Sequence, residues 1–163
     1  MPKRAAKITP FLWYVNEAEE AAKFYVSLFP KSRIRRVWAV QTDNPSGKAG
    51  KVKVVEFTLN GQPFSAMSAG PLDPFNHAVS FMVSCETQKE IDRLWSRIKK
   101  HGGEEQQCGW IRDRYGLCWQ IVPATLNDMM ADPDTAKAKR TAKAMMSMVK
   151  FNIAKLKKAH AGK

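Results

Sequence analysis

The sequence has few of the residue types that build metal, redox and nucleophilic sites. Its 163 residues include three histidines and three cysteines, Cys85, Cys108 and Cys118. The odd cysteine count and the spacings match no zinc or redox motif, so we expect reduced thiols that serve as small apolar residues. No Ser/His/Asp or Cys/His arrangement has the signature of a nucleophilic enzyme.

Long hydrophobic runs are also missing. No stretch reaches the roughly 18 apolar residues that a membrane-spanning helix requires. The first residues, MPKRAAKITPFLWYV, lack the apolar core of a signal peptide. We therefore expect a cytoplasmic protein with no membrane partner.

Positive charge is abundant but unevenly placed. The net charge is +12, and residues 131–163 hold nine Lys and Arg against two Asp, whereas the rest of the chain holds 18 against 13 acidic residues. Only one aromatic residue, Phe151, lies among the tail lysines, so the tail lacks a stacking platform for nucleic-acid bases. This distribution favours a solvated basic helix over a nucleic-acid surface, with docking of an acidic partner on the tail as an alternative.

The first half of the chain predicts one strand, one helix and three strands. Asn16 and Glu19 form a capping-box pattern at the start of the helix, and Asn60-Gly61 is a strong hairpin signal. The predicted elements are a strand at 8–15, a helix from Asn16 to Pro30, and strands at 34–41, 51–59 and 62–68. The segment 69–76, with two prolines, connects the two halves.

The second half repeats this plan. It predicts a strand at 77–84, a helix capped by Thr87, a weak strand at 104–107 and a hairpin at 108–123 whose Gly116 suits a positive φ. When the last hairpins of the two halves are aligned in sequence, Ser65 is equivalent to Gln120. Such internal duplication supports the element assignment. The predicted fold class is α+β, with two tandem βαβββ modules (8–68 and 77–123) that pair into a curved sheet with a concave cleft. Both belong to one domain, 1–130, followed by a basic helical extension, 131–163.

Four segments carry a resemblance to a known family: FLWYVNEAEEAAKFYVSLFP, FTLNGQPFSAM, VSCETQKEIDRLW and CGWIRDRYGLCWQIVP. Together they resemble the PhnB-like proteins, which carry the label 3-demethylubiquinone methyltransferase. These belong to the vicinal oxygen chelate superfamily, with glyoxalase, fosfomycin-resistance proteins and extradiol dioxygenases. The labelled methyl transfer is not expected, because the chain has no glycine-rich turn after its first strand.

The resemblance implies where a metal would bind. Enzymes of the superfamily mostly hold a divalent metal with side chains from the first and last strands of the two modules, and these positions fall here on Pro10, Ala78, Ser65 and Gln120. Of the four, only Gln120 is able to ligate, so we predict no metal and no other cofactor. A shift of one residue would bring His77 to the cleft face and reopen a metal site.

Seven residues are candidates for a functional site. Two are candidate catalytic groups: Glu56, either a solvent-facing residue or a pocket base with a raised pKa, and His77, either a surface histidine or a general base. The other five are candidate ligand-binding residues, since alternation and the resemblance place them at the cleft: Tyr14, Ser65, Ser80, Trp110 and Gln120.

Two functions follow from these residues, and the sequence does not decide whether the protein is an enzyme. The first is metal-free binding of a small apolar or aromatic molecule in the cleft, oriented by Gln120, Ser65 and Tyr14. The alternative is a divalent-metal-dependent lyase, isomerase or dioxygenase of the glyoxalase type, using His77, Glu56 and Gln120. In either case the resemblance implies a homodimer.

Overall fold

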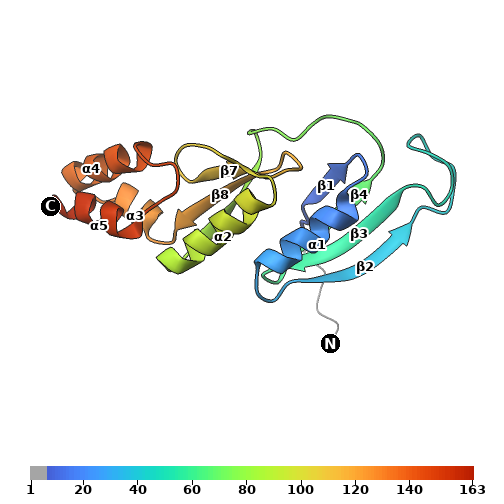
Figure 1. The fold of residues 1–163 in the computed structure, drawn as a ribbon, viewed down its shortest axis with the longest axis horizontal. Helices are drawn as coiled ribbons and strands as arrows, with labels where there is room; N and C mark the ends of the chain where they lie inside the picture. The colour runs from blue at the N-terminus through green and yellow to red at the C-terminus, as the bar shows by residue number, and fades with distance from the viewer. Residues whose placement is uncertain (1–6) are drawn as a thin grey trace. The chain divides into compact units, whose positions relative to one another are not determined.

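The computed structural model describes residues 7–163, which pack into two compact units (Figure 1). One unit runs through Pro74 and the other begins at Phe75. The boundary falls inside the predicted connector 69–76.

The first unit is a four-stranded mixed sheet with one helix. Its elements are β1 (Phe11–Tyr14), α1 (Ala18–Leu28), β2 (Arg33–Ala39), β3 (Lys53–Leu59) and β4 (Gln62–Ser68). The strand order is β1-β4-β3-β2, in which β1 is parallel to β4 and the other pairs are antiparallel. Asn60 and Gly61 both have positive φ, as the predicted two-residue hairpin turn requires.

Helix α1 covers one face of this sheet with its apolar stripe. The stripe includes Ala18, Ala21 and Tyr25, which are fully buried. The predicted cap is wrong: the N-cap is Glu17, with no side-chain hydrogen bond, and Asn16 lies before it. The hydroxyl of Ser68 instead accepts from the Ala18 N–H at 3.1 Å, so a residue distant in sequence caps the helix.

The second unit repeats this arrangement and adds helices. Its elements are β5 (Ser80–Cys85), α2 (Gln88–Lys100), β6 (Glu104–Glu105), β7 (Trp110–Arg112), β8 (Cys118–Pro123), α3 (Leu126–Met130), α4 (Thr135–Met146) and α5 (Ile153–Ala161). The strand order is β5-β8-β7-β6, with β5 parallel to β8. Thr87 caps α2 as predicted, because its side chain accepts from the Glu90 N–H. The first strand starts at Ser80 and not at His77, since residues 77–79 form a turn.

One buried carboxylate organises the β7–β8 hairpin. Asp113 is 4% exposed; its Oδ1 accepts from the N–H groups of Tyr115 (2.9 Å) and Leu117 (3.0 Å), and its Oδ2 accepts from the indole Nε1 of Trp119 at 2.9 Å. Gly116 has a φ of +91°, as predicted. This turn fixes which face of the sheet each residue of β8 occupies.

The C-terminal extension is packed into the second unit. The N–H groups of Cys108 and Gly109 donate to the carbonyls of Met148 and Val149, both at 2.8 Å. Phe151 is 1% exposed and lies against Gly109, where a Cβ would be only 2.3 Å from the ring. The Gln88 side chain donates to the Phe151 carbonyl and accepts from the Ile153 N–H. The extension is therefore part of the folded unit.

The observed architecture confirms the predicted α+β class. It consists of two four-stranded mixed sheets, each with one covering helix, and a helical C-terminal extension. Pairing of the two modules around one cleft stays a prediction. None of the helices between residues 7 and 163 combines the length and the apolar content needed to cross a membrane.

Candidate functional site

The face of the first sheet opposite α1 carries two cross-strand rows of side chains. Strand register places residues of all four strands side by side in each row, and partners in register point to the same face. The first row consists of Arg36, Glu56, Ser65 and Phe11. The second row, next to the first, consists of Trp38, Val54, Met67 and Trp13. We call these eight residues the first open face. It is mainly apolar and aromatic, with Phe11 56% and Trp38 42% exposed.

Glu56 is the only carboxylate of the first open face, and it is held by two neighbours. Its Oε1 accepts from Arg36 Nη2 at 2.5 Å and from the indole Nε1 of Trp38 at 3.2 Å. The hydrogen bond from Arg36 lowers the pKa of Glu56 below its ordinary value. The interpretation of Glu56 as a pocket base with a raised pKa is therefore wrong; the side chain is a partly exposed, ion-paired carboxylate.

Tyr14 lies on the other face of the same sheet. Register pairs it with Ser68, whose hydroxyl contacts the start of α1, and Tyr14 is 4% exposed. Its hydroxyl is 3.1 Å from the hydroxyl of Tyr25 on α1. The prediction that Tyr14 shares a face with Ser65 is wrong, because Ser65 pairs with Phe11 and a strand alternates its side chains between faces.

The second sheet has a comparable open face opposite α2. Register aligns Met82, Gln120 and Trp110 in one row, and Ser80, Cys118 and Arg112 in the next. We call these six residues the second open face. The Gln120 amide donates to the Ser80 hydroxyl at 2.9 Å, so the predicted residues Ser80, Trp110 and Gln120 do come together. Burial raises the pKa of the Cys118 thiol, which disfavours a reactive thiolate.

His77 lies in the turn before β5 and not on a strand. Its ring is 6.0 Å from the Trp110 ring, and its Nε2 is 2.9 Å from the Gln106 side-chain oxygen. It is exposed and flanks the second open face at Trp110. Glu56 belongs to the first unit, whereas His77 and Gln120 belong to the second, so a site made of all three stays a prediction.

The first-strand positions differ from those expected for a metal site. The residue beside Ser65 is Phe11 and not Pro10, and the residue beside Gln120 is Met82 and not Ala78. The second difference accompanies the later start of β5, at Ser80 and not at His77. These four side chains offer one amide oxygen as a hard ligand, and residues 7–163 contain no group of three His, Cys, Asp or Glu placed to hold a metal ion. The residues present do not fit a divalent cation.

Sequence reasoning missed most of the first open face. Arg36, Trp38, Trp13 and Met67 were not among the candidate residues, although all four lie on predicted strands. Alternation within each strand is visible in the sequence, but the face follows only from the register between strands, and β2 contains an irregularity between Ile34 and Arg36 that shifts its phase.

The chain is similar to a family model and to several solved structures. The model described as 3-demethylubiquinone-9 3-methyltransferase matches residues 6–122. A putative 3-demethylubiquinone-9 3-methyltransferase, PhnB protein, from Bacillus cereus is 36% identical, with 73% of this chain and 100% of that chain covered and a TM-score of 0.62. No curated protein matches the chain.

Two further structures share the fold at low sequence identity. The fosfomycin resistance protein FosX from Mesorhizobium loti is 11% identical, with 79% of this chain and 99% of that chain covered and a TM-score of 0.54. Protein PA1353 from Pseudomonas aeruginosa is 19% identical, with coverages of 71% and 95% and a TM-score of 0.52. Because the family model spans most of both βαβββ modules, the chain belongs to the PhnB-like family, labelled 3-demethylubiquinone-9 3-methyltransferase.

Proposed function

We propose that this protein binds a small apolar or aromatic molecule on the open faces of its sheets without a metal ion. The observation that carries the proposal is the composition of those faces. Each combines aromatic and aliphatic side chains with a few fixed polar groups, which is the usual make-up of a small-molecule site. Apolar surface of this kind drives binding when it leaves water.

The polar groups would orient the ligand. On the second open face the Gln120 amide is held by Ser80, which leaves its oxygen available to a hydroxyl or N–H of a ligand beside Trp110 and Met82. On the first open face Ser65 lies between Phe11 and Glu56, where its hydroxyl would serve the same purpose. Tyr14 has no part in the proposal, because it is buried beneath α1.

Neither the metal-dependent alternative nor the labelled methyl transfer has a matching residue set. The open-face residues do not fit a divalent cation. The strand-to-helix turns, residues 15–17 and 86–87, contain no glycine, and the sheets are mixed. A nucleotide-type methyl donor is usually bound by a glycine-rich turn at a doubly wound sheet.

Thermal unfolding with a neutral aromatic probe tests the proposal. Saturating 1-naphthol, with EDTA present, should raise the midpoint, since a ligand that binds only the native state adds roughly 2.7 kcal/mol at a hundredfold excess over Kd. Gln120→Leu should reduce this shift, whereas the exposed control Gln62→Leu should keep it. A shift that requires added zinc or manganese would overturn metal-free binding.

We also propose that the protein is a cytoplasmic homodimer. Free thiols at Cys85, Cys108 and Cys118 support a reducing location. The exposed aromatic side chains Phe11 of β1 and Trp38 of β2 lie on one face of the sheet and support burial against a second copy. Sedimentation showing a monomer at micromolar concentration would contradict the dimer.

A further inference from the structure

We propose that α4 and α5 form a docking site for an acidic peptide segment of a protein partner, which would place an apolar side chain between the two helices. This region lies beyond residue 122, where the family match ends. The proposal does not depend on the small-molecule binding proposed for the sheets.

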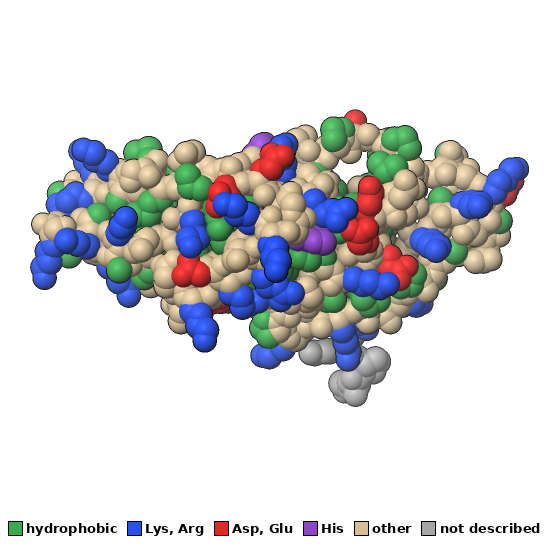
Figure 2. Space-filling view, viewed as in Figure 1, with side chains coloured by type: hydrophobic (Ala, Val, Ile, Leu, Met, Phe, Trp, Pro, Cys, Tyr) green, Lys and Arg blue, Asp and Glu red, His purple; other side chains and the backbone are tan. Residues whose placement is uncertain are grey.

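The two helices and the two residues that follow α5 present positive charge that no carboxylate neutralises. Figure 2 shows Lys and Arg side chains gathered over the end of the second unit that carries α4 and α5. Both acidic residues of the extension are engaged: Asp132 pairs with His160 at 3.2 Å, and Asp134 caps α4. Within the extension, the exposed lysines that form no ion pair with a carboxylate of residues 7–163 are Lys139, Lys143, Lys155, Lys157, Lys158 and Lys163.

The charged surface is preformed. Phe151 and the backbone bonds from Cys108 and Gly109 fix the chain between α4 and α5, and Lys150 pairs with Asp92 of α2 at 2.6 Å. A partner would therefore bind a fixed array of charges and lose less conformational entropy than on a flexible tail.

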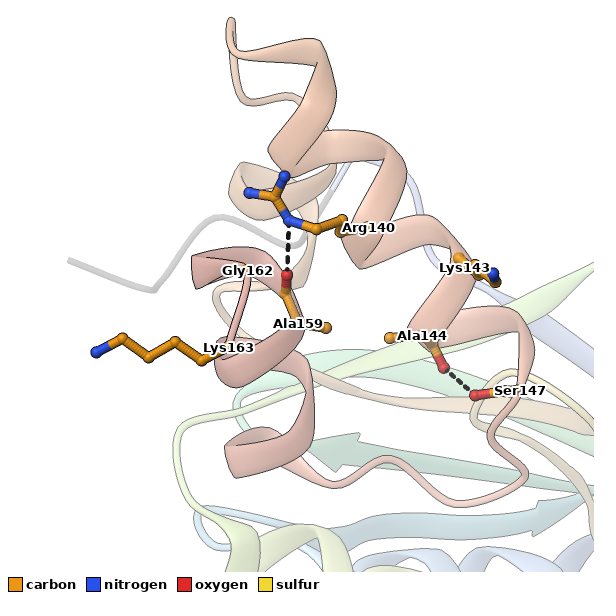
Figure 3. Close-up of a pocket in the computed structure, with 7 residues that line it drawn as sticks. All are labelled: Arg140, Lys143, Ala144, Ser147, Ala159, Gly162 and Lys163. Carbon is orange, nitrogen blue, oxygen red and sulfur yellow. Dashed lines mark hydrogen bonds between the residues drawn. The ribbon is translucent and has the colours of Figure 1, made fainter.

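A hollow of about 430 Å³ lies between the two helices (Figure 3). Ala144 and Ala159 contribute small apolar side chains to it, and Lys143 and Lys163 extend outward on its two sides. Arg140 is used within the fold, because it donates to the carbonyls of Ala159 and His160 at the end of α5. The hollow thus combines a small apolar surface with a cationic rim.

This combination favours a peptide over the other polyanions. A duplex nucleic acid would contact the lysines through phosphates and would gain nothing from the apolar surface. The extension's single aromatic residue, Phe151, is 1% exposed and cannot stack on bases. A membrane surface usually needs a wide apolar face with aromatic anchors, whereas the large apolar side chains exposed here are Met146 and Val149. A segment of Glu with Leu would use both the charge and the hollow.

Two arginine substitutions separate docking in the hollow from simple charge attraction. We would measure binding of a fluorescent peptide of alternating Glu and Leu to the full chain. Ala144→Arg adds charge but fills the hollow, so we expect binding about tenfold weaker, which is roughly 1.4 kcal/mol. Ala136→Arg adds the same charge at an exposed position of α4 and should bind equally or more tightly. Equal gains from both substitutions would overturn the proposal.

A second pair of variants covers loss of folding in the first. Lys143→Glu, at the rim, should weaken the peptide more than Lys51→Glu, which makes the same charge change in the first unit. Absence of peptide binding to the wild-type chain would also overturn the proposal. So would tighter binding of duplex DNA or of phosphatidylserine vesicles than of the peptide at the same salt concentration.

Discussion

Asp113 shows how one side chain sets the geometry of the second sheet. It provides acceptors to two backbone N–H groups and to the Trp119 indole while 4% exposed. Asp113→Ala removes the acceptor of all three donors, two of which are buried, so we expect a loss of about 3 kcal/mol in the free energy of unfolding. Urea denaturation would measure it, with the exposed Asp73→Ala as control. A loss equal to that of the control would contradict this role.

Glu56 should make a small, pH-dependent contribution to the free energy of unfolding. Its pKa is lowered in the folded state by the hydrogen bond from Arg36, so its stabilisation is present above the ordinary value of 4.5 and is lost as pH falls through the folded pKa. Because the pair is partly exposed, Glu56→Gln should cost less than about 1 kcal/mol at neutral pH. The difference from wild type, measured by urea denaturation, should vanish in acid, and a loss of the same size in acid would contradict this role.

At the scale of elements, the C-terminal extension depends on one glycine. Gly109 has a φ of +76°, and a Cβ there would be 2.3 Å from the Phe151 ring and 3.0 Å from the Ile121 carbonyl oxygen. Gly109→Ala combines backbone strain with overpacking and should cost about 2–4 kcal/mol. It should also expose the lysine-rich extension to trypsin.

The matched control for this substitution is Gly50→Ala. Gly50 has a similar φ of +81°, but an added Cβ would meet nothing within 4 Å. It should therefore cost only the backbone strain, about 1–2 kcal/mol. Equal losses at the two glycines would mean that Phe151 does not anchor the extension.

Local chemistry explains which elements could be predicted from sequence. The Asn60-Gly61 turn, the positive φ at Gly116 and the Thr87 cap each depend on residues close in the chain, and all three were predicted correctly. The Asn16 cap failed because Ser68, 50 residues from Ala18, supplies the acceptor. The predicted start of β5 was three residues too early, because apolar residues just before a strand cannot be distinguished by sequence from its first residues.

The same distinction explains the site. Ser80, Trp110 and Gln120 were placed together correctly, because alternation within one module sufficed. Tyr14 was assigned to the wrong face, since its position depends on the parallel register of β1 with β4. Arg36 and Trp38 were missed for a similar reason: the irregularity in β2 becomes visible only when the strand pairs. Register between strands distant in sequence is not encoded in local patterns.

At the scale of the whole molecule, the two units share one packing arrangement. Each buries one sheet face under a helix and leaves the other face with aromatic and apolar side chains. Three tryptophans, Trp13, Trp38 and Trp110, lie on the open faces. The other two, Trp95 of α2 and Trp119 of β8, are buried in the core, at 3% and 2% exposed. The tryptophans on the open faces therefore report directly on ligand binding there, and the two core tryptophans serve as internal controls.

The measurement that tests the central claim is a titration of the ¹⁵N-labelled protein with 1-naphthol in EDTA, followed through the five indole N–H signals. The account predicts saturable shifts for at least one of Trp13, Trp38 and Trp110, and unchanged signals for Trp95 and Trp119. Saturable shifts that appear only after a divalent metal is added would contradict it. So would shifts confined to Trp95 and Trp119, or none at all.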